Sequence, residues 1–248
     1  MGILNVTPDS FADGGKHNDF EAAIARGLEM IAEGVDIIDI GGESTRPGAD
    51  RVSEEEEIAR TIPVIAELAK HGTPISIDTM RSTTAEAAIK AGASIINDVS
   101  GGLADSEMLQ TAARLQVPYI AMHWRGQSKD MNSKAVYGDV VSDVISELNE
   151  RIEAALDAGI QKDKLIIDPG LGFAKDAEHN WAIIDSIDQF VALGYPVLVG
   201  GSRKRFLGGD TPDEREEATI QLTKRLGATG VWAVRVHSVK PHKEVLSS

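Results

Sequence analysis

Charged and amide side chains stand at the ends of short apolar runs that are spread along the whole sequence. Asp168 follows Leu165, Ile166 and Ile167 and leads into the turn "PGLG". Other apolar runs end in the same way, in Asn5, Asp39 with Glu43, Asp78, Asn97 with Asp98, His123, Ser202 to Lys204, and Arg235 with His237. One acid at a strand end often does no more than bond loop amides. So many together indicate a shared site.

The mixture of these groups limits the chemistry of a ligand. The carboxylates of Asp78 and Asp168, with the amide of Asn97, can bond the edge of a flat heterocycle that carries amino and ring N–H groups. A pterin or a purine has such an edge. The cationic candidates suit an anion, because guanidinium groups match its geometry; they are Arg46, Lys204, Arg235 and His237. We therefore expect a heterocycle attached to a phosphate.

Other polar residues near these runs are expected to play smaller parts. His237 follows Arg235 by two residues and so shares its strand face, which favours a functional role. We expect His123 to be a structural, hydrogen-bonded histidine. Lys175, at the end of "DPGLGFAK", is interpreted as a loop cation without a chemical role.

A barrel scaffold is predicted by eight strand-like runs that alternate with segments of helical spacing. The runs cover about 2–6, 35–40, 74–78, 93–98, 118–122, 164–168, 196–200 and 231–236. They are nearly continuously apolar, which is typical of parallel strands covered on both faces. A doubly wound sheet would give a similar local pattern, but no G-x-G-x-x-G turn follows the first run. We expect a single-domain α/β protein, a parallel (β/α)8 barrel, with all strand ends opening on one face.

Helix boundaries are predicted by local signals. Gly34, Gly72 and Gly92 end helical segments just before strand-like runs, as left-handed C-caps do. "SEEE" at 53–56 matches a capping box, and Pro63 falls inside the helical pattern that follows and should bend it.

Composition excludes several classes of protein. The chain has 248 residues, which fits one barrel domain, and no cysteine for disulfides or thiolate metal sites. Its formal net charge of -14 argues against nucleic acid or anionic lipid as a partner. No apolar run is long enough for a membrane span, and no signal peptide is evident, so we expect a cytoplasmic protein.

Eight motifs, in order along the chain, resemble those of the dihydropteroate synthase family. They are "MGILNVTPDSFADGG", "IIDIGGESTRPGA", "SIDT", "IINDVSGG", "MHWRG", "DPGLGFAK", "GGSRKRFLG" and "VRVH". The resemblance covers essentially the whole chain. It implies a cytoplasmic, homodimeric transferase of folate synthesis, a target of sulfonamides, that joins 6-hydroxymethyl-7,8-dihydropterin diphosphate to 4-aminobenzoate and releases pyrophosphate.

The resemblance also implies roles for particular residues. The pterin would be held by Asp78, Asn97, Asp168 and Lys204, with Met122 and Phe173 on the walls. Asn5 would bind the Mg²⁺ that accompanies the diphosphate, whose oxygens would be surrounded by Thr45, Arg46, Arg235 and His237. The 4-aminobenzoate pocket would be formed by Thr7, Pro8, Phe11 and Pro47.

Departures from the family pattern leave alternatives open. The chain begins inside the first strand-like run and ends soon after the last, so the domain, residues 1–248, is expected to be shortened at both ends. Arg205 stands where many relatives have Ser, and Ser238 where many have an acid. The rival functions are a pterin-dependent methyltransferase and a non-catalytic pterin-binding homologue.

Overall fold

The computed structural model describes residues 1–7, 16–43, 52–126 and 131–247. Its strands are β1 (Gly2–Asn5), β2 (Ile38–Gly41), β3 (Ile75–Asp78), β4 (Ile95–Asp98), β5 (Tyr119–Met122), β6 (Leu165–Asp168), β7 (Leu198–Val199) and β8 (Ala233–Val234). Each lies within or next to a predicted run and most are shorter at the amino end, so the predicted strand order is confirmed.

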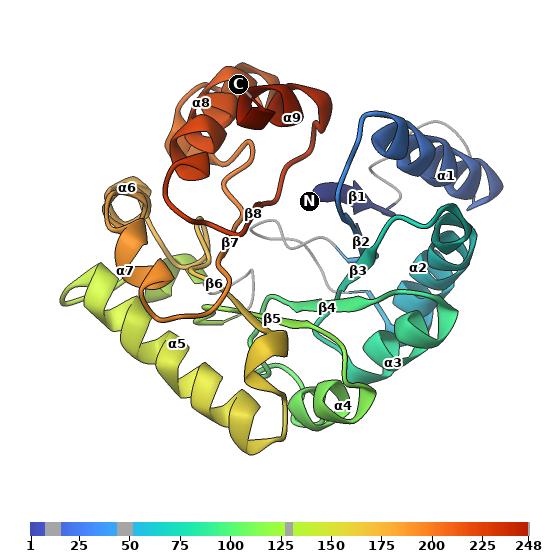
Figure 1. Ribbon diagram of the computed structural model, residues 1–248, viewed down its shortest axis with the longest axis horizontal. Coiled ribbons are helices and arrows are strands. Elements are labelled where there is room, and N and C mark those ends of the chain that lie inside the picture. Colours follow the sequence, from blue (N-terminus) through green and yellow to red (C-terminus); the bar gives the residue numbers. More distant parts are fainter. Residues whose placement is uncertain (8–15, 44–51, 127–130, 248) are drawn as a thin grey trace.

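Helices follow the strands in the predicted alternation. They are α1 (Lys16–Ala32), α2 (Glu54–Leu68), α3 (Ser82–Ala91), α4 (Met108–Leu115), α5 (Val140–Asp157), α6 (Ala177–Asp185), α7 (Ile187–Val191), α8 (Glu216–Gly227) and α9 (Lys240–Ser247). Short 3₁₀ turns lie at Ala69–His71, Met131–Lys134, Lys162–Lys164, Arg205–Leu207 and Asp213–Arg215. The helices surround the strands on the outside (Figure 1). No helix within the described ranges is both long and apolar enough to cross a membrane.

The strands form a parallel (β/α)8 barrel. β1 to β6 pair in sequence order, and β7 pairs with β8. The two sheets are joined by parallel bridges, Ile167 with Val197 on one side and Gly2 with Val236 on the other. At the second junction the Ile3 amide donates to the Val236 carbonyl at 2.8 Å. Sequential pairing that returns to β1 is the order of a barrel, whereas a doubly wound sheet reverses its strand order.

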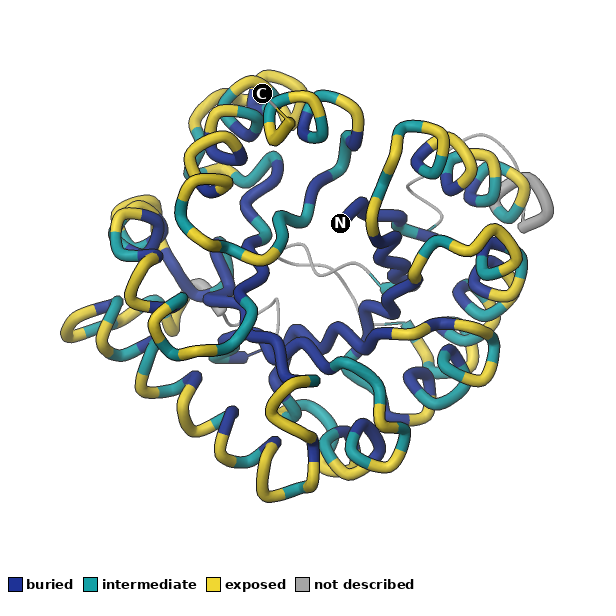
Figure 2. Tube along the Cα trace, viewed as in Figure 1, coloured by how far each residue is buried: buried dark blue, intermediate teal, exposed yellow. Residues whose placement is uncertain are grey.

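Alternate residues of each strand face two different cores. The inward face carries a small apolar layer of strand residues and their immediate neighbours, made of Met1, Ile37, Ile95, Ile120, Ile166 and Leu198 with Ala233. The outward face packs with the helices into the larger core, to which Ile38, Ile96 and Ile167 belong. Both faces are therefore buried, as Figure 2 shows along the strands, which explains why the runs are almost continuously apolar.

The predicted helix ends agree with the structure. Gly34, Gly72 and Gly92 have φ of 82°, 79° and 117°, the left-handed conformation that a C-cap glycine supplies. Ser53 caps α2 by accepting from the Glu56 amide at 3.2 Å, which is the serine half of the predicted capping box. The helix continues through Pro63, which lies inside it.

Candidate active site at the carboxyl ends of the strands

The candidate site is the mouth of the barrel, the opening at the carboxyl ends of the strands. Its side chains stand two residues after the inward apolar layer on each strand. The inward apolar residues Ile37, Ile95, Ile120, Ile166 and Ala233 form the closed layer. Two residues further on, where the side chain faces inward again, stand Asp39, Asn97, Met122, Asp168 and Arg235. The strand register places these residues at the same height along the barrel, because Asp78 pairs with Asn97 and Met122 pairs with Asp168. Strand alternation thus places one functional group after another around a single opening.

Arg235 ties three strands together in this mouth. Its Nε donates to Asp39 Oδ2 at 2.5 Å and its Nη2 donates to Asp78 Oδ2 at 2.6 Å. Asn97 Nδ2 donates to the same Asp39 oxygen at 3.1 Å. The predicted convergence of Asp78, Asn97 and Arg235 is therefore confirmed. A bound ligand was expected to link them, but Arg235 bonds Asp78 directly, and Asp39 bonds both Arg235 and Asn97.

The electrostatics of this group follow from two buried acids that share one guanidinium. Burial raises the pKa of Asp78 to about 7, while the charge of Arg235 opposes the rise. Burial lowers the pKa of Arg235, but Asp39 and Asp78 outweigh it and raise the pKa above its usual value. Arg235 therefore stays charged. A ligand that donates a further hydrogen bond to Asp78 would stabilise its carboxylate form.

Asp168 occupies the opposite side of the mouth. Its Oδ1 accepts from the Gly170 amide at 2.7 Å, and the residue is 5% exposed. Burial raises its pKa, while the Gly170 bond and the charge of Lys204 oppose the rise. Burial also lowers the pKa of Lys204 to about 8. The Lys204 ammonium lies 4.6 Å from the centre of the Phe173 ring and donates to the Leu171 carbonyl.

The turn after Asp168 passes very close to β5. Gly170 and Gly172 have φ of 69° and 75°. A Cβ on Gly170 would overlap the His123 carbonyl oxygen, and one on Gly172 would approach Lys204 Cδ to 2.7 Å. Both positions therefore favour glycine for conformation, and Gly170 requires it for space as well, because the atom that it approaches belongs to the backbone. The turn brings Phe173 back to the mouth beside Lys204.

Lys175 lies in the loop between β6 and α6, as predicted, but it is buried rather than solvated. It is 9% exposed, and its Nζ lies 2.8 Å from His123 Nδ1. Burial lowers its pKa to about 7. His123 is 1% exposed and is hydrogen-bonded through both ring nitrogens, as expected for a structural histidine. The turn's carbonyl groups and the His123 ring supply the acceptors that allow a lysine to be buried here.

His237 lies beside Ser202 at the ends of β8 and β7. Its Nδ1 is 2.9 Å from Ser202 Oγ, and its backbone amide donates to the same oxygen at 3.2 Å. Arg26 from α1 donates to the His237 carbonyl at 3.2 Å. Met122 is buried at the end of β5, and Asn5 and Thr7 are partly buried at the end of β1 and just beyond it.

Some strand-end residues turn away from the mouth. Arg203 pairs with Glu216 on α8, at 2.7 Å from Nε to Oε2. Asp98 bonds the Ser100 and Gly102 amides, each at 2.7 to 2.8 Å, and accepts from the Tyr119 hydroxyl, so it stabilises its own loop. Arg205 is exposed, and Ser238 donates to Glu216.

Sequence reasoning did not assign a role to Asp39 or Lys175. Asp39 carried a usable signal, since a charged residue inside the apolar run "IIDIG" and in the inward phase must find a buried partner. Lys175 carried none, because its partners are His123, which follows another strand, and two carbonyl groups earlier in the turn. Pro8, Phe11, Thr45, Arg46 and Pro47 lie outside the described residues.

Metal ligands are sparse in the described part of the chain, where no group of three or more His, Asp or Glu side chains could hold an ion. Asn5 offers a single amide oxygen at the mouth. Mg²⁺ retains water and substrate oxygens and needs few protein ligands, so this donor set fits an ion that enters with a diphosphate.

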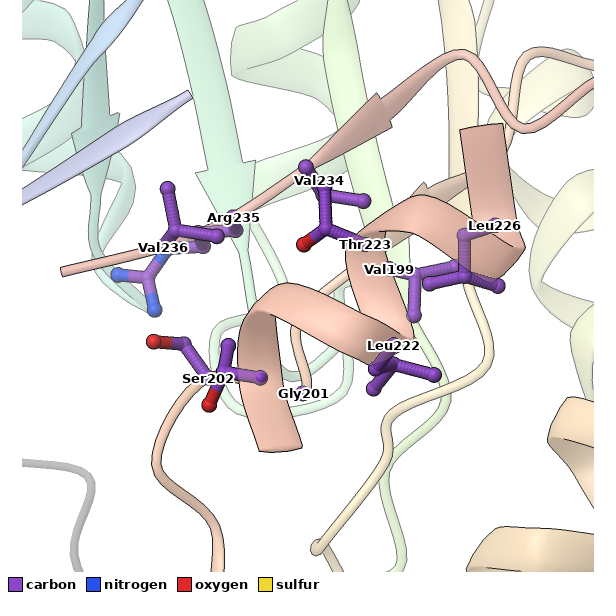
Figure 3. Close-up of a pocket in the computed structure, with 10 residues that line it drawn as sticks. Val199, Gly201, Ser202, Leu222, Thr223, Leu226, Val234, Arg235 and Val236 are labelled. Atoms are coloured by element: carbon purple, nitrogen blue, oxygen red, sulfur yellow. The ribbon is translucent and has the colours of Figure 1, made fainter. Parts of the chain in front are cut away.

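A small cavity lies behind the mouth, between α8 and the β7–β8 pair. Leu222 and Leu226 of α8 face Val199 and Val234 across it, and Arg235 directs its guanidinium away from these leucines (Figure 3). The cavity is on the helix side of the strands and its lining is mainly apolar. It is therefore a packing gap, distinct from the mouth.

Comparisons with known proteins agree with this geometry. A family model described as pterin binding enzyme matches residues 1–237. The dihydropteroate synthase of Mycobacterium leprae is 45% identical over 256 residues, which cover 99% of this chain and 90% of that protein. A structure of the Xanthomonas albilineans dihydropteroate synthase with 4-aminobenzoic acid is 44% identical with a TM-score of 0.94, and covers 100% of this chain and 90% of its own. The same enzyme in complex with 7,8-dihydropteroate is 40% identical with a TM-score of 0.90, at the same coverage.

Fold, site and family model together define a (β/α)8 barrel of the pterin-binding class, with its polar groups at the carboxyl ends of the strands. Within that class, the chain is 45% identical to a dihydropteroate synthase over 99% of its length. The chain belongs to the dihydropteroate synthase family.

Proposed function

We infer that this chain is a dihydropteroate synthase, a transferase that joins 6-hydroxymethyl-7,8-dihydropterin diphosphate to 4-aminobenzoate and releases pyrophosphate in folate synthesis. Its relatives with this name match it over nearly their full length. A similar structure holds 7,8-dihydropteroate, and another holds 4-aminobenzoic acid. The observation that carries the inference is the convergence of Asp78, Asn97 and Arg235, with Asp168 facing them, in one barrel mouth.

The pterin end of the site is assigned to the acid and amide groups. Asp168 accepts from the paired amino and ring N–H groups of the pterin through the oxygen that the Gly170 amide leaves free to point inward. Asp78 and Asn97 bond the opposite edge. Lys204 donates to the pterin's acceptor atoms, and Met122 and Phe173 supply the apolar walls.

The diphosphate end is assigned to the cations. Arg235 uses Nε and Nη2 for Asp39 and Asp78, and we assign its third nitrogen, Nη1, to an oxygen of the leaving group. His237, Thr45 and Arg46 surround the remaining oxygens. Asn5 contributes an amide oxygen to the Mg²⁺ that comes with the diphosphate, and the ion supplies charge neutralisation there.

The mechanism follows from which groups are present. The carbon–oxygen bond to the diphosphate breaks first and leaves a methylene cation delocalised into the dihydropterin. The arylamine of 4-aminobenzoate then attacks that carbon and releases a proton to solvent. A strong base is unnecessary for this order. Arg46, Arg235 and His237 stabilise the charge that develops on the departing diphosphate, and the pterin contacts hold the carbon in line.

The second substrate and the setting of the enzyme complete the proposal. We assign 4-aminobenzoate to Thr7, Pro8, Phe11 and Pro47, where sulfonamides would compete with it. The resemblance supports a cytoplasmic homodimer with one barrel domain over residues 1–248. Its negative net charge of -14 gives no support to a nucleic acid or membrane partner.

Pyrophosphate release with both substrates tests the function. Arg235→Ala and Asp168→Asn should each lower kcat/KM by about 10² to 10³, as the loss of a charged active-site group typically does. Arg225→Ala is the matched control, because this arginine is exposed on α8 and pairs with an exposed acid at the end of α6, Asp185, at 2.7 Å. Pterin binding without pyrophosphate release would identify the non-catalytic homologue, and methyl transfer to a corrinoid protein would identify the methyltransferase.

A further inference from the structure

A buried chain of ionisable groups runs behind the turn that follows Asp168. Lys175 Nζ lies 2.8 Å from His123 Nδ1, and His123 Nε2 lies 2.9 Å from Glu147 Oε2 on α5. Arg125 closes the chain, with its Nε 3.0 Å from the same Glu147 oxygen. The function proposed above assigns no role to these groups, and the inference drawn from them rests on that function.

One arrangement of protons satisfies every contact of Lys175. An ammonium group has three donors, and Lys175 has three acceptors in reach: His123 Nδ1, the Gly170 carbonyl at 3.1 Å and the Phe173 carbonyl at 3.1 Å. His123 then accepts at Nδ1 and carries its proton on Nε2, which donates to the Glu147 carboxylate. We assign this tautomer because it leaves no lone pairs facing each other.

Several side chains fix the turn in a backbone conformation that it would not adopt alone. Ala174 has φ of 48°, a left-handed value that is unfavourable for alanine. Its carbonyl accepts from the Tyr137 hydroxyl at 2.9 Å. The Gly172 amide donates to Asn180 Oδ1 at 2.6 Å. Lys175 binds two carbonyls of the turn, at Gly170 and Phe173, and so bridges most of its length.

We propose that Lys175 is a positioning residue for the pterin pocket: its ammonium group, aligned by His123 and Glu147, holds the turn at residues 169–174 so that Asp168 and Phe173 face the ligand. The Gly170 amide bonds Asp168 Oδ1, and the Gly170 carbonyl bonds Lys175, so one peptide segment links the buried lysine to the carboxylate. Lys175 acts through the turn and does not touch the pterin.

The charge of Lys175 makes this support depend on pH. The groups that face it are His123 and Arg125 after β5, Glu147 of α5, Asp168 of β6 and Lys204 after β7. Burial lowers the pKa of Lys175 to about 7, and the charge of Asp168 opposes the shift. Burial lowers the pKa of His123 further, to about 4, so the shared proton resides on the lysine. As pH rises through about 7 the lysine loses a donor, and the turn loosens.

Calorimetric titration with 6-hydroxymethyl-7,8-dihydropterin tests the proposal in the full chain. At a pH of about 6, Lys175→Met should raise the Kd for this pterin at least about tenfold, because three hydrogen bonds of a charged donor are lost. At saturating pterin diphosphate, the KM for 4-aminobenzoate should stay within about twofold. Lys162→Met is the control, since Lys162 is exposed in the 3₁₀ turn at the other end of β6.

The pH dependence separates positioning from a merely structural role. The ratio of the mutant Kd to the wild-type Kd should shrink as pH rises from about 6 to about 9, since the wild type loses the same proton. The ratio of the two Kd values cancels the effect of Asp78 titration, which both proteins share. Glu147→Gln removes a charge that raises the pKa of Lys175, so the alkaline weakening should move to lower pH.

The outcomes decide between the proposals. Unchanged pterin affinity in Lys175→Met, or an unmoved pH profile in Glu147→Gln, overturns the positioning role alone. Should Lys175→Met fail to fold, Glu147→Gln and Tyr137→Phe decide, because Tyr137→Phe removes one bond to the turn and should raise the Kd by about two- to fivefold. A wild-type chain that neither binds the pterin nor releases pyrophosphate overturns both the positioning role and the proposed function.

Discussion

Single residues in the mouth depend on each other's charges. Asp39 is fully buried and accepts from Arg235 and Asn97 through the same oxygen. Arg235 in turn bonds Asp78. Removing one carboxylate therefore leaves the guanidinium only partly compensated in a buried place, which costs more than the loss of a surface ion pair. Asp39 thus organises the site without being assigned a substrate contact.

Asp39→Ala is expected to lower the free energy of unfolding by about 3 to 5 kcal/mol, the usual cost of breaking a buried pair. Asp36→Ala is the matched control three residues earlier, because Asp36 is 69% exposed and pairs with Lys243 at the surface. It should change the free energy by less than about 1 kcal/mol. Urea unfolding of the wild type and the two variants measures both changes in free energy. If Asp39→Ala loses as little stability as Asp36→Ala, the burial of Arg235 does not depend on Asp39.

Asp78 should give pterin binding an acidic limit. Its pKa rises on folding from 3.8 to about 7, so the free enzyme protonates it as pH falls through about 7. A protonated acid accepts ligand N–H groups less well, and affinity for 6-hydroxymethyl-7,8-dihydropterin should therefore weaken below that pH, by at most about tenfold per unit. Asp78→Asn should bind this pterin about 10 to 100 times more weakly at a pH of about 8. Its affinity should no longer weaken as pH falls below about 7. If the acidic weakening of affinity persists in Asp78→Asn, another group causes it.

The turn between β6 and α6 shows how one short element shapes the site. It leaves Asp168, passes against the β5 backbone at Gly170, and returns at Phe173. Left-handed residues at Gly170, Gly172 and Ala174 make this path possible. The side chains of Tyr137, Asn180 and Lys204 form hydrogen bonds to its backbone. Its shape is therefore sensitive to the added volume of a single methyl group.

Gly170→Ala should disrupt the turn far more than the same change elsewhere. Both Gly170 and Gly194 have left-handed φ, 69° and 80°, but a Cβ on Gly194 meets nothing within 4 Å. Gly194→Ala should cost about 1 kcal/mol of stability for backbone strain alone and leave kcat/KM unchanged. Gly170→Ala also clashes with the His123 carbonyl, so kcat/KM for the pterin diphosphate should fall by at least about tenfold. Equal kinetics for the two variants would contradict the close approach.

The whole barrel consists of two hydrogen-bonded sheets that meet at two bridges. β7 and β8 have only two residues each, whereas β1 to β6 have four. The mouth residues come from both sheets, since Asp78, Asn97 and Asp168 belong to the larger one and Arg235 follows β8. A ligand that contacts all of them would connect the sheets.

Bound pterin should therefore stabilise the molecule as a unit. At about 100 times its Kd, 6-hydroxymethyl-7,8-dihydropterin should add about 2.7 kcal/mol to the free energy of unfolding. For a chain of this size that raises Tm by roughly 5 to 10 °C in differential scanning calorimetry. Asp168→Asn at the same ligand concentration should show a much smaller rise. A full rise in that variant would place the ligand outside the mouth.

Amide hydrogen exchange can locate the same effect. Protection should increase in β7 and β8, which join the larger sheet through isolated bridges, more than in β2 and β3. Protection confined to the larger sheet would show that the ligand does not span the two.

The sequence by itself determined the order of the elements, the helix ends and the polar residues that follow the strands. Glycine C-caps and apolar runs that end in a polar residue are local properties, which is why Gly34 and Asp168 were placed correctly. Only the tertiary structure decided which charges meet. Asp39 and Arg235 are 196 residues apart in the chain, and Lys175 and His123 are 52 apart, so closure of the barrel and the path of one turn bring them together. A buried charge is stable only with a partner, and the partner's identity depends on that closure, which no local pattern encodes.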